Sequence, residues 1–147
     1  MKAKAALSLR LVLATITLGT SMLVTAFAAP PTEAGSSAWF TSPSRNIGCM
    51  MMATETRCDT NAYTYSPPPE PVWCDLGWGP SVVVRSAGRG HFLCAGDTVA
   101  GAPTILGYGA SRNIGRFSCT SRRTGMRCVD TRNGHGFRIS RASYSLF

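Results

Sequence analysis

The sequence predicts a small all-β domain that is stapled by disulfides and preceded by an N-terminal signal helix. All six cysteines lie beyond an N-terminal export-like segment, and an even number in an exported chain indicates three disulfides. From residue 39 onward, no window of about 12 residues has the apolar spacing of a helix. Short runs rich in β-branched residues alternate instead with Gly, Pro, Asn and Ser. This pattern is typical of a barrel or sandwich, here with about seven short strands.

The first 28 residues have the three-part layout of a secretory signal peptide. Three basic residues precede an apolar stretch, residues 11–24. Residues 26–28, Ala-Phe-Ala, then have the small–bulky–small pattern that a signal peptidase cleaves. We therefore expect cleavage after Ala28 and removal of residues 1–28. An uncleaved anchor is the alternative, but this apolar stretch is shorter than the roughly 20 residues that a membrane-spanning helix needs. No membrane span is expected in the mature form.

A flexible leader is expected over residues 29–38. This segment is small and polar and contains two prolines, so it buries too little apolar surface to offset the entropy of ordering it. The disulfide-rich β domain is then expected over residues 39–147. A chain of that length can bury a single core, and nothing in it indicates a second domain.

Seven segments have the composition and length of short strands. They are residues 47–52, 56–59, 81–85, 91–94, 116–120, 126–130 and 136–140. Between the second and third, the link SPPPEP at residues 66–71 is too rich in proline for a helix or a central strand. We expect it to cross the surface as a stiff polyproline segment.

An internal repeat is the most informative pattern in the chain. The string SRNIG occurs at residues 44–48 and again at residues 111–115, and each copy is soon followed by two cysteines with eight residues between them. The spacing from the glycine to the first cysteine differs between the copies. The two units are therefore similar but not identical.

The equal cysteine spacing favours a cross-strand disulfide in each unit. In the second unit, strand alternation and a loop at residues 122–125 place Cys119 opposite Cys128, with Gly125 free to take positive φ. Cys49 and Cys58 allow the same arrangement. Cys74 and Cys94 then remain to pair with each other. Other pairings stay open, because six cysteines allow many.

Several short strings together carry a resemblance to a known family. In chain order they are FTSPSRNIGC, RCD, CDLGWG, CAGDT, FSC, GMRC and GHGFRISRASYSLF, and they span residues 40–147. Together they resemble a family of small secreted actinobacterial proteins that is catalogued only as a domain of unknown function. The resemblance implies export and cysteine pairing. It supplies no activity, ligand or catalytic residue.

Arginine dominates the charge of the expected mature domain. Loss of the leader lowers the formal charge from +8 to +5 and leaves 12 arginines and no lysine. Eight of these arginines lie within residues 112–141, where Asp130 is the only acidic residue. Because a guanidinium is a planar donor fork that suits phosphate and carboxylate, this third of the chain is a candidate anion-binding face. The candidates for ligand binding are Arg116, Arg122, Arg123 and Arg127. The alternative is a solvated face.

Two further residues are candidates for ligand binding. His135 lies between two glycines that would allow a ligand to approach the backbone closely, although a tight turn explains the same residues. Trp78, in the string CDLGWG, could stack against a sugar ring, or it could cover the core instead.

The sequence offers little for catalysis. A catalytic thiol needs a free cysteine, and the even count indicates that all are bonded. His91 near Cys94 superficially resembles half a zinc site, but no second pair of ligands completes it. We expect no metal and no cofactor. Paired carboxylates or a histidine with an acid are the remaining routes to hydrolysis, and the G-x-S-x-G motif is absent from the sequence.

These observations favour a non-enzymatic binding module that is secreted or associated with the cell envelope. An anionic envelope component is the partner that the arginines suit best, and no nucleic-acid motif indicates a specific nucleic-acid partner. The alternatives are a small secreted hydrolase, which would need His91 or His135 beside an acid and a cleft, and an inhibitor or effector protein.

Overall fold

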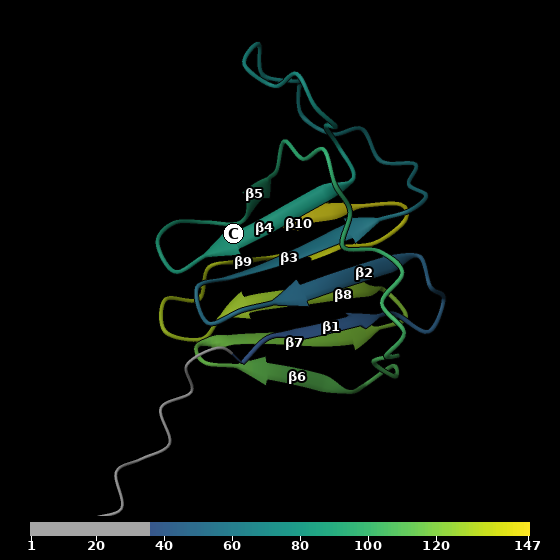
Figure 1. The fold of residues 1–147 in the computed structure, drawn as a ribbon, viewed down its shortest axis with the longest axis vertical. Helices are drawn as coiled ribbons and strands as arrows, with labels where there is room; N and C mark the ends of the chain where they lie inside the picture. Colours follow the sequence, from purple (N-terminus) through teal and green to yellow (C-terminus); the bar gives the residue numbers. More distant parts are fainter. Residues whose placement is uncertain (1–35) are drawn as a thin grey trace, which may run out of the picture. The chain divides into compact units, whose positions relative to one another are not determined.

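The computed structural model describes residues 36–147, which form ten short strands joined by turns and loops (Figure 1). This range contains no helix, and so no helix long and apolar enough to cross a membrane. The predicted signal peptide, residues 1–28, and most of the predicted leader lie outside the described residues. Ala38, at the end of that predicted leader, is buried and is the first residue of the first strand.

The strands form two antiparallel five-stranded sheets. The first sheet contains β1 (Ala38–Thr41), β2 (Ile47–Met51), β3 (Glu55–Thr60), β4 (Ser81–Arg85) and β5 (His91–Phe92). The second contains β6 (Ser111–Ile114), β7 (Phe117–Arg122), β8 (Gly125–Asp130), β9 (Gly136–Ile139) and β10 (Tyr144–Leu146). In each sheet the order in space follows the order in the chain, as expected for neighbours joined by short turns.

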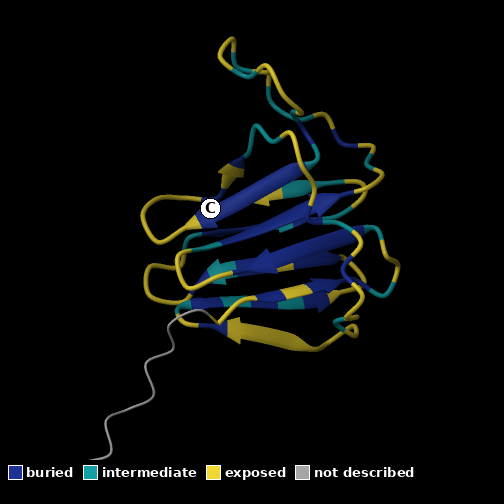
Figure 2. Cartoon of the chain, viewed as in Figure 1, coloured by how far each residue is buried: buried dark blue, intermediate teal, exposed yellow. Residues whose placement is uncertain are grey.

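The fold is therefore all-β as predicted, and of the two expected architectures, barrel or sandwich, it is the sandwich, with three strands added to the seven expected. The added strands are β1, β6 and β10, and each lies at the edge of its sheet. An edge strand is paired on one side only and needs less apolar surface than a central one. β6 shows this most clearly, because three of its four residues are exposed (Figure 2).

Two disulfides lie at the centre of the core. Cys49–Cys58 joins β2 to β3, and Cys119–Cys128 joins β7 to β8, each between directly opposed residues with Cα atoms 4.1 Å apart. The Sγ atoms of Cys58 and Cys128 are 3.6 Å apart. Because all of these sulfurs are already bonded, this approach is a van der Waals contact between two disulfides and not a hydrogen bond or a metal site. With Cys74–Cys94, the predicted pairing is confirmed.

Buried and more exposed residues alternate along β7, as strand geometry requires. Phe117, Cys119 and Ser121 on β7 are buried, while the residues between them are more exposed. The largest fully buried side chains include Phe117, Phe137, Met51 and Met126, and they come from both sheets. A single apolar cluster therefore joins the two sheets around the stacked disulfides.

The turn between β7 and β8 is tighter than the predicted four-residue loop. Arg122 pairs directly with Gly125, which leaves two residues in the turn. Gly125 has the expected positive φ, at +125°, and a Cβ at that position would collide with the carbonyl of Ile139 on β9. Glycine is therefore required here both by backbone conformation and by packing.

Each half of the chain is a five-stranded meander with a disulfide between its second and third strands. The SRNIG strings do not occupy matching places in these halves. Ile47 of the first copy begins the second strand of its sheet, whereas Ile114 of the second copy ends the first strand of its sheet. The two disulfide hairpins therefore occupy equivalent places in their sheets, but the SRNIG strings lie at different places relative to those hairpins.

Residues 96–106, which we call the strap, cross the outer face of the first sheet (Figure 1). The backbone of Thr41 accepts a hydrogen bond from the N–H of Leu106 and donates one to the carbonyl oxygen of Thr104. Near the beginning of the strap, the guanidinium of Arg57 donates hydrogen bonds to the side chain and the carbonyl oxygen of Asp97. The strap leads directly to the loop before β6.

Candidate functional site

Turns at one end of the sandwich surround a pocket of about 350 Å³, which we call the basic pocket. Its walls are the turn between β1 and β2, the loop before β6, the turn between β7 and β8, and the turn between β9 and β10. The lining residues are Ser42, Ser44, Asn46, Ile47, Tyr108, Arg122, Arg123, Gly125, Ser140 and Arg141. They include three arginines and no carboxylate.

No ion pair among the described residues neutralises the positive charge of the basic pocket. In residues 36–147 the arginines that form ion pairs are Arg57, Arg85 and Arg116, and none of these lines the pocket. The guanidinium of Arg123 lies 5.0 Å from the centre of the Tyr108 ring, which is a cation–π contact. This contact positions the cation without cancelling its charge.

The turn between β1 and β2 is held in place by side chains. Ser42 Oγ accepts a hydrogen bond from the N–H of Ile47 at 3.2 Å and lies 3.0 Å from Ser44 Oγ. The amide of Asn46 forms two hydrogen bonds of 2.9 Å with the backbone of Ala62, one as donor and one as acceptor. These contacts fix the polar wall of the pocket before any ligand arrives.

Arg45, between two lining residues, adds a fourth cation at this end of the molecule. Its φ of +57° lies in the left-handed region, which costs a non-glycine residue about 1 kcal/mol or more. The turns at this end, residues 42–46, 107–110, 122–125 and 140–143, contain no Asp or Glu. The end of the sandwich therefore carries a local excess of positive charge.

The structure brings some of the candidate arginines together and separates others. Arg122 and Arg123 line the basic pocket, whereas Arg127 lies on the outer face of the second sheet, with its guanidinium 4.9 Å from the centre of the Phe147 ring. Arg116 forms an ion pair with the buried carboxyl of Asp130. Arg116 therefore stabilises the fold and does not present a free charge to a ligand.

Reasoning from the sequence missed several lining residues. Arg141 belongs to the same arginine-rich third of the chain and could have been included on that basis. Tyr108 and the serine hydroxyls of the turn between β1 and β2 carry no comparable signal. The serines reach the site only when the two sheets pack together, and Tyr108 reaches it from the loop before β6, where its ring lies against Arg123.

The ion pair between Arg116 and Asp130 predicts an acid-dependent loss of stability. Burial raises the pKa of Asp130, but hydrogen bonds from Arg116 and the backbone N–H of Arg132 outweigh it and hold the pKa below its usual range. A carboxyl with a depressed folded pKa stabilises the protein above its unfolded pKa of about 4, and the contribution is lost as the pH falls through the folded value.

We therefore expect Asp130→Asn to be less stable than the wild type at pH 7 and to lose less stability on acidification. Denaturant unfolding of both proteins at neutral and acidic pH measures the difference. If the two curves fall in parallel below pH 4, Asp130 does not carry the acid dependence.

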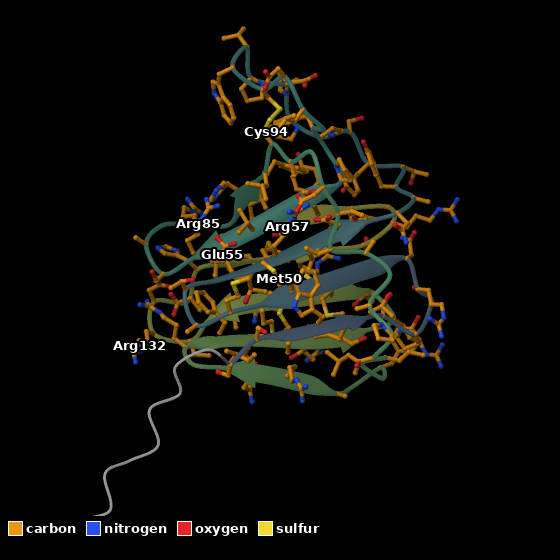
Figure 3. The ribbon with its side chains drawn as sticks, in the orientation of Figure 1. Met50, Glu55, Arg57, Arg85, Cys94 and Arg132 are labelled. Carbon is orange, nitrogen blue, oxygen red and sulfur yellow. A yellow bond between two sulfur atoms is a disulfide. The ribbon has the colours of Figure 1, made fainter. Side chains whose placement is uncertain are left out.

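Trp78 covers one edge of the core. Its Nε1–H donates to the carbonyl oxygen of Pro68 at 2.8 Å, and its ring lies 5.7 Å from that of Phe92. The protruding loop around it is tied at its base by the disulfide Cys74–Cys94, and Cys94 is labelled in Figure 3. The exposed apolar side chains of this loop are those of Val72, Trp73 and Leu76.

Neither histidine forms the arrangement that a hydrolase needs. His91 Nε2 lies 3.3 Å from Arg85 Nη1, and since a guanidinium only donates, Nδ1–H of His91 donates to the carbonyl oxygen of Arg89. His135 lies in the turn between β8 and β9, where its backbone N–H donates to the side chain of Asn133. Within the described residues, no carboxylate is hydrogen-bonded to either ring, and neither histidine lines the basic pocket.

The fold and site together define a small disulfide-stapled β-sandwich protein with a candidate anion-binding pocket between its turns. The chain belongs to DUF6636, a family of unknown function, whose family model matches residues 64–147. This agrees with the resemblance seen in the sequence. The matched range includes Tyr108 and the three pocket arginines. No curated protein and no solved structure matches the chain.

Proposed function

We propose that this protein is an exported, non-enzymatic binding module whose basic pocket takes an anionic group of the cell envelope. The observation that supports this most directly is the convergence of Arg122, Arg123 and Arg141 on one pocket to which residues 36–147 contribute no lining carboxylate. Like charges gathered without a counter-charge are unfavourable in the free protein, and an anionic ligand would relieve that repulsion.

The chemistry of the lining indicates the kind of group that would bind. Guanidinium forks donate paired hydrogen bonds to phosphate or carboxylate. In the hydrogen-bonded pair of Ser42 and Ser44, one hydroxyl donates to the other and the remaining proton is available to a ligand. The pocket volume is near the lower limit of roughly 300 Å³ for small-molecule sites. We infer that it holds one anionic group and its immediate substituent.

The hydrolase alternative has less support. It requires a histidine within hydrogen-bond reach of an acid, beside a cleft. The described residues offer no such contact at His91 or His135, while the arginines do gather at a pocket. These placements favour binding over hydrolysis.

Export is part of the proposal, and it predicts the N-terminus of the mature protein. Three disulfides are compatible with an extracellular protein. Together with the signal-like layout of residues 1–28, they lead us to expect that secreted material begins at Ala29. Intact-mass measurement and N-terminal sequencing of the secreted protein test this expectation. A retained leader would contradict it.

Loss of either Arg123 or Arg141 is expected to weaken anion binding by about tenfold or more, because a hydrogen bond to a charged group contributes about 1.5 to 3 kcal/mol. The measurement is isothermal titration of the mature protein with pyrophosphate, glycerol phosphate and a dicarboxylate at low and moderate salt. Arg123→Lys keeps the charge but removes the fork, so it should recover only part of the affinity.

Arg132→Ala is the matched control, because Arg132 lies in the turn between β8 and β9, away from the basic pocket (Figure 3). It removes one arginine without altering the pocket. If Arg132→Ala weakens binding as much as Arg123→Ala, the effect is one of net charge and the proposed site is wrong.

A further inference from the structure

The outer face of the second sheet carries arginines, and its outward strand positions contain no acidic residue. Because Phe117, Cys119 and Ser121 point into the core, the alternate residues of β7 point outward. The strand register then aligns one outward row across all five strands. Its members are Ser111, Thr120, Arg127, Arg138 and Ser145.

Two of these arginines are directly opposed. Arg127 on β8 pairs with Arg138 on β9, which places two cations side by side on the solvent face. Like charges opposite each other on antiparallel strands are destabilising. The outward positions of the second sheet include no Asp or Glu to offset the repulsion. Folding stability alone does not favour this arrangement.

Both guanidinium groups are nevertheless held in place. Arg138 donates to the carbonyl oxygen of Thr124 at 3.0 Å and to the hydroxyl of Ser143 at 3.4 Å. Arg127 lies over the ring of Phe147. These neutral partners orient the two cations and leave their charge available to a ligand.

The arginine row continues into the basic pocket. Arg122 points outward from β7 and also lines that pocket. Thr124 and Ser143, which hold Arg138, belong to the same two turns that form pocket walls. Positive charge therefore runs from the pocket across neighbouring strands, which lie about 4.8 Å apart, to Arg127.

We propose that this face binds a linear polymer of phosphate esters, with one phosphate in the basic pocket and later ones along Arg138 and Arg127. The inference rests on the proposed function of the pocket and extends it from one anionic group to a chain. A polymer without bases is favoured over nucleic acid, because the outward strand residues of the second sheet are Ser, Thr, Asn, Gly, Val and Arg, which have no ring for base stacking. The two rings beside this path, those of Tyr108 and Phe147, already lie against the guanidinium groups of Arg123 and Arg127.

The test compares short and long phosphate chains. Isothermal titration of the mature protein with tripolyphosphate and with an inorganic polyphosphate of about 15 units should show at least tenfold tighter binding of the longer chain, and a steeper dependence on salt. Poly(glycerol phosphate) and a single-stranded DNA of equal charge form two further arms. The glycerol polymer should bind like the long polyphosphate, and the DNA more weakly.

The double variant Arg127→Gln/Arg138→Gln should remove the advantage of the long chain and leave the affinity for tripolyphosphate within about twofold. Glutamine keeps most of the side-chain length, and thermal unfolding checks that the variant is folded. Arg89→Gln/Arg132→Gln removes two arginines elsewhere and should keep the advantage. The salt slope should fall by about one for each arginine that contacts a phosphate.

The possible failures are distinguishable. If both chain lengths bind equally tightly and Arg123→Ala weakens both, the pocket acts alone and this inference is wrong while the proposed function stands. If DNA binds as tightly as poly(glycerol phosphate), the preference for a polymer without bases is wrong. If no phosphate compound binds, the phosphate-polymer inference fails, and a dicarboxylate that still binds would leave the proposed function in place.

Discussion

Replacing Arg57 with alanine is expected to lower the free energy of unfolding by about 3 to 5 kcal/mol, the usual cost of breaking a buried ion pair from one side. Arg57, which is labelled in Figure 3, is 6% exposed and donates two hydrogen bonds of 2.9 Å to the carboxylate of Asp59, which is also buried. Burial lowers the pKa of Arg57, but the carboxylates of Asp59 and Asp97 raise it by more. The alanine variant leaves the buried carboxylate of Asp59 without its guanidinium partner and with the hydrogen bond from the Val99 N–H.

The control is Arg85→Ala. Arg85 pairs with Glu55 at 2.8 Å, but that pair is partly exposed, so its loss should cost no more than about 1 kcal/mol. Denaturant unfolding at neutral pH compares the two variants. A double variant with apolar residues at positions 57 and 59 should recover much of the loss, because it removes the unpaired charge. A cost for Arg57→Ala as small as that of the control would contradict this account.

The same variant connects stability with the candidate site. Arg57 holds the beginning of the strap through Asp97, and the strap leads to Tyr108 in the wall of the basic pocket. Loss of Arg57 should therefore loosen a segment that helps to form the pocket. We expect anion affinity to fall in Arg57→Ala even though Arg57 does not line the pocket.

The second large effect is expected from the stacked disulfides. Removing Cys49–Cys58 by a double alanine substitution should cost about 4 to 5 kcal/mol, near the upper end for a native disulfide. Part of the loss is the freedom that the unfolded chain regains. The rest comes from the space left beside Cys128, because the sulfurs of Cys49 and Cys58 are fully buried and one lies 3.6 Å from Cys128 Sγ.

The matched comparison is the double alanine variant at Cys74 and Cys94. Loop-closure entropy alone predicts a larger cost there, since the sequence separation is 20 against 9 for the core pair. The structure predicts the opposite order, because Cys74–Cys94 ties a protruding loop outside the core. Thermal and denaturant unfolding of both variants decide between the two. A greater loss for the Cys74–Cys94 variant would show that core packing is not the dominant contribution.

The hairpins could be predicted from the sequence because their signals are local. Cys119 and Cys128 are separated by eight residues, and apolar residues alternate along the chain on either side of them. This local pattern is enough to place the two cysteines opposite each other in a hairpin, without knowledge of the rest of the fold. The contact between Cys58 and Cys128 could not be predicted. It depends on how the two sheets pack together, and no periodicity along the chain reports that.

The candidate site was only partly predictable for the same reason. Arg122 and Arg123 were found because arginines cluster in that part of the sequence. Arg116 belongs to the same cluster, but the turn between β6 and β7 places it beside the buried end of β8, where Asp130 neutralises it. Ser42 reaches the pocket from the opposite sheet. Composition therefore predicts that this part of the chain is basic, while tertiary packing determines which arginines form ion pairs and which line the pocket.

The central claim, that the turns around the basic pocket bind anions, is tested most directly by nuclear magnetic resonance. A titration of ¹⁵N-labelled mature protein with pyrophosphate should shift amide signals in residues 42–46, 107–110, 122–125 and 140–143. Signals from the turn between β8 and β9, which contains Arg132 and His135, should stay in place. Shifts confined to that opposite end, or no shifts at low salt, would contradict the claim.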